Sequence, residues 1–243
     1  GTTETKKINL TDLGVLAPRA AAGGGTAYVG GNQSGEPRGS GALDIQTERA
    51  GAARVAGGEK SIAVGSDILV SADKSYAFGR SNFVKGTNSL VAGEQISVES
   101  GGSSSLALGR DMNISGKRTI ACGAHIDTNT GTTDGIAFGK SIKFFDDSSQ
   151  SITLGNNIEY HNGRDSAALG YALRVSGNNI TCIGRNNNVY DKSSHTMGEF
   201  NDIRSGALES VTVGRNIDVS GERSLAFGDY INVSSDSKNS ISI

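Results

Sequence analysis

Apolar positions recur along this chain in a short alternating pattern that closes on a glycine. The pattern first appears at residues 61–65 as Ser-Ile-Ala-Val-Gly, and it returns at 75–79, at 89–93 and onward. Successive closing glycines are 14 to 16 residues apart. They are Gly65, Gly79, Gly93, Gly109, Gly123, Gly139, Gly155, Gly170, Gly184, Gly198, Gly214 and Gly228. A short period kept over this many copies is typical of a repeat protein, in which each copy stacks on the next.

Each repeat predicts two strands. The second and fourth positions of the repeat are mostly large and apolar, and the third is small. Because side chains alternate between the faces of a strand, one face is bulky and apolar and the other consists of Ser, Ala and Gly. A face of small residues indicates that something approaches closely on that side as well. A shorter strand is predicted after the closing glycine, where apolar residues alternate again, as in Ile68 and Val70.

A polar stretch, called the polar loop below, ends each repeat, and the longer repeats gain their extra residues mainly there. Glycine in every repeat and an apolar spacing of two disfavour helix. We therefore predict an all-β fold, a parallel β-roll (solenoid) of 14–16-residue repeats. One strand face should fill the inside of the coil and the other should pack against copies of the chain, but the pattern does not decide which. Ala137→Phe is expected to disrupt assembly, because the small face has no room for a ring.

The chain divides into three predicted segments. Residues 1–35 carry no repeat and form an irregular N-terminal arm or linker, with an attachment role and a plain linker as the two interpretations. Residues 36–58 form a capping lead-in segment, in which Leu43 and Ile45 alternate with Asp44 as in a strand. A stack of repeats needs such an atypical terminal unit, because its outer edge has no partner. Residues 59–243 form the repeat domain.

Composition supports a thin repetitive structure. The chain has 243 residues with 35 glycines, no tryptophan and 35% hydrophobic residues, which is little bulk for one deep core. The net charge of −2 implies no attraction to nucleic acid or to an anionic membrane. Two cysteines make no disulfide framework, and no apolar run approaches the ~20 residues that span a bilayer. The first residues do not resemble a signal peptide, so either processing has removed one or the protein is not exported by that route.

Enzymatic chemistry finds no support in the motifs of the sequence. It contains no H-E-x-x-H, G-x-S-x-G or P-loop pattern. His125, His161 and His195 occupy different repeat positions and do not converge, so we predict no metal site and no cofactor. A glycan-cleaving spike would need a carboxylate pair in a groove, and short repeats leave no long loops to build one. We therefore predict that the protein is not an enzyme.

One column of basic residues is a candidate for ligand contact. The residue after the closing glycine is Arg80, Arg110, Lys140, Arg185 or Arg215 in five repeats. Stacking would bring these residues into a line, and such a line suits an anionic surface glycan. Glu94, Glu199 and Asp229 occupy the same column, however. Mixed signs favour ordinary solvated corners over a glycan-facing stripe.

The repeats resemble those of a known family. Units such as residues 61–65 and 105–109 look like the S-x-A-Φ-G head repeats of trimeric autotransporter adhesins, in which Φ is apolar. That resemblance covers residues 59–243 and implies a left-handed β-roll assembled as a homotrimer. Residues 38–58 are similar instead to a lead-in that precedes such repeats in bacteriophage tail-fibre and other virion-fibre proteins. No adhesin-type neck motif or coiled-coil stalk follows the repeats within the chain.

These resemblances imply a structural fibre protein of a bacteriophage virion, a tail fibre or similar projecting fibre involved in host attachment. It would lie on the virion surface, joined to other virion proteins through its N-terminal arm. Its partners would be two copies of itself and a glycan or protein of the host surface, with no nucleic acid and no membrane insertion. The alternative is the head domain of a bacterial trimeric adhesin, placed on the bacterial outer-membrane surface and binding host surfaces.

Overall fold

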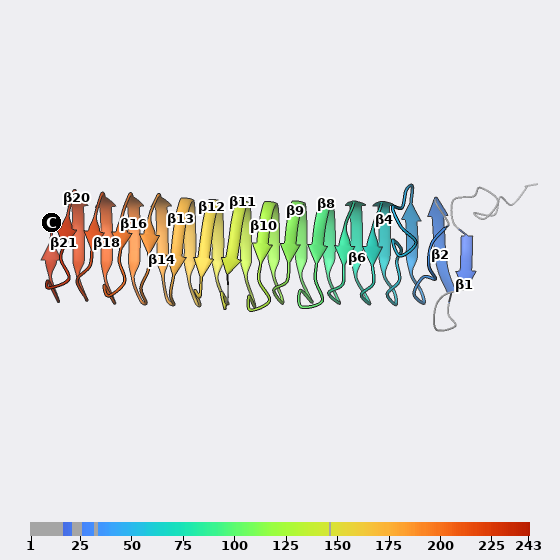
Figure 1. Cartoon of the computed structure of the whole chain (residues 1–243), viewed down its shortest axis with the longest axis horizontal. Coiled ribbons are helices and arrows are strands. Elements are labelled where there is room, and N and C mark those ends of the chain that lie inside the picture. The colour runs from blue at the N-terminus through green and yellow to red at the C-terminus, as the bar shows by residue number, and fades with distance from the viewer. Residues whose placement is uncertain (1–16, 21–25, 32–33, 146) are drawn as a thin grey trace, which may run out of the picture. The chain divides into compact units, whose positions relative to one another are not determined.

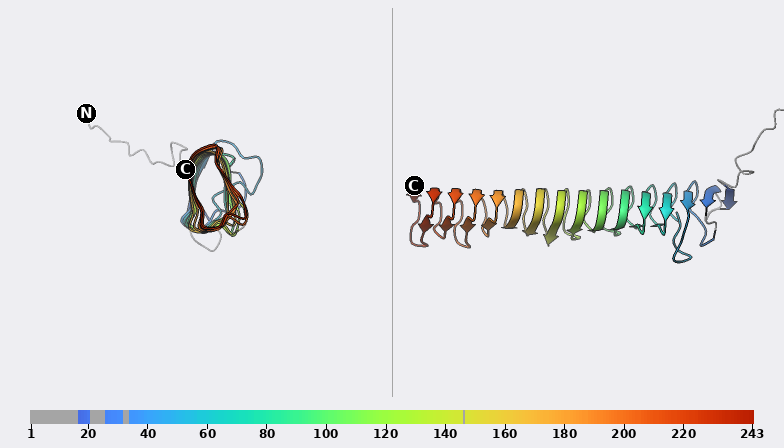
Figure 2. Two further views of the ribbon diagram at one scale, coloured as in Figure 1. Left: turned by 90° about the vertical axis from the view of Figure 1, so that its left-hand side faces the viewer. Right: turned by 90° about the horizontal axis from the view of Figure 1, so that it is seen from above.

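The computed structural model describes residues 17–20, 26–31, 34–145 and 147–243. The chain divides into two compact units, residues 1–104 and residues 105–243. Within the described ranges both units are all-β, without a helix, and both are coils of parallel strands (Figure 1). Together they hold about 13 turns, and each turn is a flattened loop (Figure 2). The prediction of a parallel β-solenoid is confirmed.

The first unit begins with a hairpin and continues as parallel turns. The hairpin joins β1 (Ala17–Ala20) antiparallel to β2 (Thr26–Gly31). β2 then pairs parallel with β3 (Leu43–Gln46). The later turns of this unit are also joined in parallel. Their strands are β4 (Ile62–Ser66), β5 (Leu69–Val70), β6 (Tyr76–Arg80), β7 (Phe83–Val84) and β8 (Leu90–Val98).

Part of the predicted N-terminal arm belongs to the coil. β2 lies within residues 1–35, and Tyr28 stands in parallel register with Leu43 of β3. The stretch lacks the Ser-x-Ala-Φ-Gly pattern, so periodicity alone could not assign it to a turn. Residues 1–16, 21–25 and 32–33 of the predicted arm lie outside the described residues, and its attachment role stays a prediction.

The second unit keeps the repeat in register from turn to turn, with Gly123 beside Gly139 and Gly139 beside Gly155. Five of its strands run through the corner without a break. They are β9 (Leu106–Ile114), β10 (Ile120–Thr128), β11 (Ile136–Phe145), β12 (Ile152–His161) and β13 (Ala167–Ser176). The later strands are shorter. They are β14 (Thr181–Arg185), β15 (Asn188–Val189), β16 (His195–Glu199), β17 (Asp202–Ile203), β18 (Val211–Arg215), β19 (Asp218–Val219), β20 (Leu225–Asp229), β21 (Asn232–Val233) and β22 (Ile241–Ser242).

The small face of the first strand segment points into the coil, and the bulky face points out. In β11, Ala137 is fully buried, whereas its neighbour Phe138 is 39% exposed. The second strand segment does the reverse, because Ile142 is fully buried and Lys143 is exposed. The structure thus decides which face is inside. Ala137→Phe would overfill the core of the coil, so its expected effect moves from assembly to folding.

Left-handed backbone corners bend each turn. One corner lies two residues after the closing glycine, as at Ser141 with φ of 55°, and the other lies just before the buried serine, as at Gln150 with φ of 52°. The closing glycine also has positive φ, 141° at Gly139. A Cβ atom on Gly139 would overlap the carbonyl oxygen of Gly155 in the next turn. Both conditions are met only by glycine.

The lead-in turn has a core of ion pairs and amides. The carboxylate of Asp44 is fully buried, and it accepts hydrogen bonds from Arg38 Nε at 2.7 Å and Arg49 Nη2 at 2.8 Å. Gln46 donates to the other Asp44 oxygen at 2.8 Å and accepts the Ile68 amide N–H at 2.6 Å. The alternation in this segment is therefore a strand with its polar side inside. A buried ion pair of this kind holds only while both partners are present, because either charge alone is costly to bury.

Candidate functional site

The serines of the repeat are used inside the coil. Ser105 Oγ donates to the carbonyl of Gly116 at 3.2 Å and accepts the amide N–H of Thr119 in the next turn at 3.0 Å. Ser210 repeats this arrangement with the carbonyl of Gly221 at 3.0 Å and the amide N–H of Ser224 at 3.0 Å. These hydroxyls join neighbouring turns and satisfy buried backbone groups. The serines of the repeat therefore supply structure, not a binding surface.

A second set of buried polar residues was not predicted from the sequence. Three asparagines stand third after a closing glycine, where most turns have an apolar residue; they are Asn82, Asn187 and Asn201. Asn201 Nδ2 donates to the carbonyls of Met197 at 3.3 Å and Gly214 at 3.0 Å, and its Oδ1 accepts the Ile217 N–H at 3.1 Å. The sequence signal was available, because asparagine recurs at one fixed distance after the glycine.

An apolar face covers the outer side of the first strands. In the first unit it includes Tyr76, Phe78 and Leu90, exposed by 37 to 39%. In the second unit its members are exposed by 36 to 50%. They are Leu108, Ile120, Phe138, Ile152, Leu154, Met197 and Phe227. A row of large apolar side chains repeated on one side of a coil is a contiguous apolar surface, and such surfaces mark contacts with other molecules.

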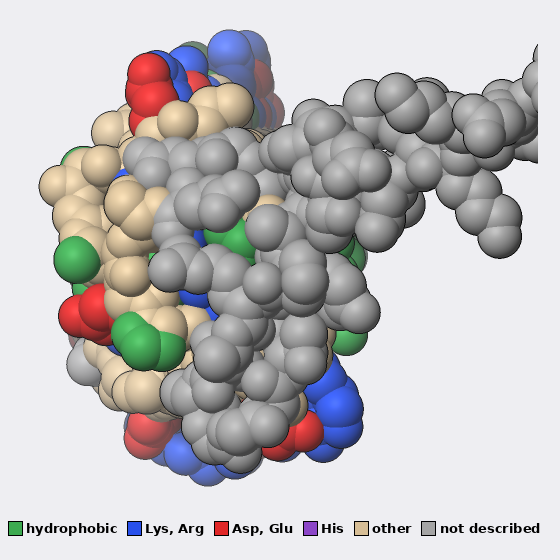
Figure 3. Space-filling view, turned by 90° about the vertical axis from the view of Figure 1, so that its right-hand side faces the viewer, with side chains coloured by type: hydrophobic (Ala, Val, Ile, Leu, Met, Phe, Trp, Pro, Cys, Tyr) green, Lys and Arg blue, Asp and Glu red, His purple; other side chains and the backbone are tan. Residues whose placement is uncertain are grey.

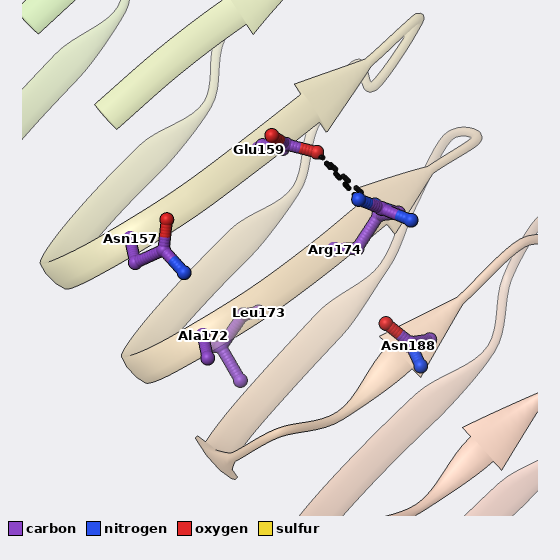
Figure 4. Close-up of a pocket in the computed structure, with 6 residues that line it drawn as sticks. All are labelled: Asn157, Glu159, Ala172, Leu173, Arg174 and Asn188. Carbon is purple, nitrogen blue, oxygen red and sulfur yellow. Dashed lines mark hydrogen bonds and ion pairs between the residues drawn. The ribbon is translucent and has the colours of Figure 1, made fainter. Parts of the chain in front are cut away.

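In the second unit the outer side of the second strands is polar and charged. Arg174 of β13 contacts Glu159 of β12 at 3.0 Å, beside a pocket of about 200 Å³ that Asn157 and Asn188 also line (Figure 4). Two hydrogen bonds raise the pKa of the Arg174 guanidinium, the larger effect coming from the Tyr190 phenol and the next from the Glu159 carboxylate. In the view of the N-terminal end, acidic and basic side chains lie together at the top and at the bottom of the picture (Figure 3). This side of the coil is suited to water.

The candidate basic column is interrupted and paired. In the second unit Arg110 and Lys140 are separated by Ala124, and Arg185 and Arg215 by Glu199, in the register of the strands. Each cationic side chain thus stands between residues of other kinds. Most of the column also has carboxylate partners. These pairs are Arg80 with Glu94, Arg110 with Asp111, Arg185 with Glu199, and Arg215 with Asp229. Pairing removes most of the positive field that an anionic glycan would meet.

The histidines lie apart from one another. His125 lies 3.8 Å from Asp111, His161 stacks on Phe145 with ring centroids 4.4 Å apart, and His195 is exposed in β16. Among the described residues, no three His, Cys, Asp or Glu side chains are grouped to hold a metal ion.

Both cysteines are free. Cys182 is fully buried in the coil, and burial raises the pKa of its thiol to about 12. Burial also raises the pKa of the half-buried Cys122. A raised pKa keeps a thiol protonated and poorly nucleophilic.

No family model matches the sequence, and no curated protein matches it as a relative. The resemblance of the repeats to adhesin heads and of the lead-in to virion fibres therefore stays a prediction. In the part of the chain that the structure describes, no helix has the length and apolarity to cross a membrane.

Proposed function

We propose that this chain is the subunit of a homotrimeric structural fibre on a bacteriophage virion, where it serves in host attachment. The observation that carries the proposal is the apolar face, which both units place on the outer side of their first strands. Apolar surface left in water favours association, because burial against another surface releases its hydration. A fibre built from copies of this chain would bury that surface along each coil.

A second copy is the partner that the apolar face fits best. Its rows repeat at the spacing of parallel strands, about 4.8 Å, and an identical coil offers rows of the same spacing. The charged outer side of the second strands, with pairs such as Arg204 and Asp218, would stay in water. The threefold symmetry and the left-handed coil come from the resemblance to adhesin heads, and a closed ring of copies is the usual outcome of such symmetry.

Assembly is tested by matched substitutions on the two outer sides of the same turns. Phe138→Asp with Phe227→Asp places two carboxylates in the apolar face, and Lys143→Asp with Asn232→Asp places two carboxylates on the polar side. We expect the first variant to be monomeric and the second to keep the wild-type mass in multi-angle light scattering. A wild-type chain that is a folded monomer at micromolar concentration would refute the proposal.

The proposed location of the fibre on a virion is inferred from the lead-in segment. Residues 38–58 resemble the segment that precedes such repeats in virion fibres, which favours a bacteriophage particle with the N-terminal arm joined to other virion proteins. The repeats alone favour the alternative, the head of an adhesin on the bacterial outer-membrane surface. Immunogold labelling with antibody against the repeat domain separates the two. Label on projecting fibres of the particle supports the first, and label on intact bacterial cells free of phage supports the second.

A further inference from the structure

The second unit carries a trough on the side away from its apolar face. Three pockets of about 250, 540 and 400 Å³ lie along its second strands and polar loops, between residues 113 and 192. The first two share Asn129 and Thr130, and the last two share Asp147 and Asn162. We call this continuous surface the polar trough. Its pockets fall mostly within the size range of small-molecule sites, but polar groups dominate their lining.

The trough lies mainly where three longer repeats follow one another. The closing glycines from Gly123 to Gly170 are spaced by 16, 16 and 15 residues, and the next step to Gly184 is 14. The third pocket is lined by Asp147 and Asn162 of the longer repeats together with Ser176 and Gly177 of the shorter one. Hydrogen bonds hold the walls in place. They run from Arg164 N to Asn178 Oδ1 at 3.1 Å and from Gly206 N to Asp191 Oδ2 at 2.6 Å.

Charges in the third pocket are balanced. Two carboxylates, Asp147 and Asp191, face two cations, Arg164 and Lys192, and Arg164 lies 3.5 Å from Asp147. No excess of either sign remains to select a phosphate, a sulfate or a metal ion. Carboxylates, guanidinium and amide groups placed together can both accept and donate hydrogen bonds, as pairs of neighbouring hydroxyls require. The chemistry favours an uncharged ligand rich in hydroxyl groups.

Aromatic side chains line the trough at two places. Phe145 lines the first pocket and stacks on His161 with planes 8° apart, and Tyr190 lines the third pocket. Aromatic rings pack against the C–H faces of sugar rings, whose edges remain free for hydrogen bonds. Phe145 and Tyr190 lie three turns apart, which is roughly 14 Å at about 4.8 Å per turn. That span suits a chain of sugar rings better than a single sugar.

We propose that the polar trough binds a segment of an uncharged polysaccharide that runs across successive turns of the second unit. The proposal rests on the host-attachment function proposed above and names the class of its ligand. Self-association through the apolar face leaves the trough open, because the two surfaces lie outside different strands. Binding and assembly are thus separate properties of the coil.

The experiment measures binding of the full chain to immobilised neutral polysaccharides, namely dextran, mannan, a galactan and neutral bacterial O-polysaccharides, with heparin as the anionic comparison. We expect binding to at least one neutral glycan that persists at high salt. Binding to none of them, or to heparin alone with loss at high salt, overturns the proposal.

Substitutions at two tyrosines test where the ligand binds. Tyr190→Ala should weaken binding about tenfold, whereas Tyr190→Phe should keep it, since the ring carries the contact. Tyr171→Ala is the matched control, because Tyr171 is 50% exposed but does not line the trough. Equal losses in Tyr190→Ala and Tyr171→Ala, or no loss in Tyr190→Ala, would overturn the assignment to the trough.

The same preparations separate this proposal from the assembly proposal. The Phe138→Asp, Phe227→Asp variant should be monomeric and still bind glycan through each single trough, with lower avidity. A wild-type monomer that binds glycan would refute assembly and leave the trough standing. A trimer that binds no neutral glycan would refute the trough alone.

Discussion

The two strand segments of a turn place their large side chains differently. The first segment places them outside the coil, and the second places them inside. In β11 the first segment turns Ala137 inward and Phe138 outward, and the second turns Ile142 inward and Lys143 outward. A coil this thin has no space for large side chains from both walls, so small residues of one segment face large residues of the other. The apolar bulk of the first segment is thereby left outside. This difference separates what the coil needs for folding from what remains for contacts with other molecules.

The outer surfaces differ for the same reason. Outside the first strands lie side chains such as Leu154 and Met197, exposed by 40 and 50%. Outside the second strands lie ion pairs such as Arg174 with Glu159. Association and glycan binding are therefore proposed for different sides of the coil. Four predictions on stability test which residues of each turn are needed for folding and which are not.

The largest effect is expected from Ala137→Phe, because the ring would enter the filled core of the coil. We expect a loss of about 3 kcal/mol or more in the free energy of unfolding, or no folded protein. The measurement is thermal unfolding followed by far-UV circular dichroism. Phe138→Tyr, on the outer side of the same strand, is the control and should unfold as the wild type does. An unchanged transition for Ala137→Phe would mean that the small face is not enclosed.

The next effect contrasts the two sides of the second strand. Ile142→Ala leaves a cavity at a fully buried position and should cost about 2–4 kcal/mol. Lys143→Ala changes an exposed side chain and should stay within about 0.5 kcal/mol. Denaturant unfolding of both variants gives the comparison. Similar losses in the two would contradict the assignment of inner and outer sides.

A smaller effect is expected at Asn201, where an asparagine side chain occupies the inner position that is apolar in most turns. Asn201→Ala leaves the Gly214 carbonyl and the Ile217 N–H without their side-chain partner, at a cost of about 1–3 kcal/mol. Hydrogen exchange of the Ile217 amide should quicken along with the lower stability. Asn232→Ala on the outer side of β21 serves as the control and should change neither.

The smallest effect concerns the exposed ion pairs between turns. The side chain of Arg215 is the main cause that lowers the pKa of Asp229 from its ordinary 3.8. A lowered folded pKa means that the ionised carboxylate stabilises the fold above 3.8, and this contribution is lost as the pH falls through the folded value. Because both groups are exposed, the change should be small and weaker in salt.

Thermal unfolding at neutral pH and below the ordinary pKa of 3.8 checks this, with wild type compared to Arg215→Gln. The variant should lose less stability than the wild type on acidification. An equal or larger loss would show that the pair contributes nothing through Asp229.

Much of the fold could be predicted from particular residues. The recurring glycines located the turns, and the alternation at residues such as Ile136, Phe138 and Ile142 located the strands. The lead-in was predicted as a strand, but the burial of Asp44 was not, because the two guanidinium groups that neutralise it come from outside the strand. The polar trough was not predicted either, since its residues are far apart in sequence and only the stacking of turns joins them.

The sequence by itself determined the repeat, the strands, the position of the closing glycines and the all-β class, because period and local conformation are properties of neighbouring residues. Only the tertiary structure decided which face is inside. Neither face of the first strand carries charge, so hydropathy did not show which of them lies inside the coil. The volume available inside the coil decided it. Ala137 and its equivalents fit opposite the large side chains of the second strand, and Phe138 does not. Because the large side chains of the first strand do not fit inside, an apolar face remains outside the coil.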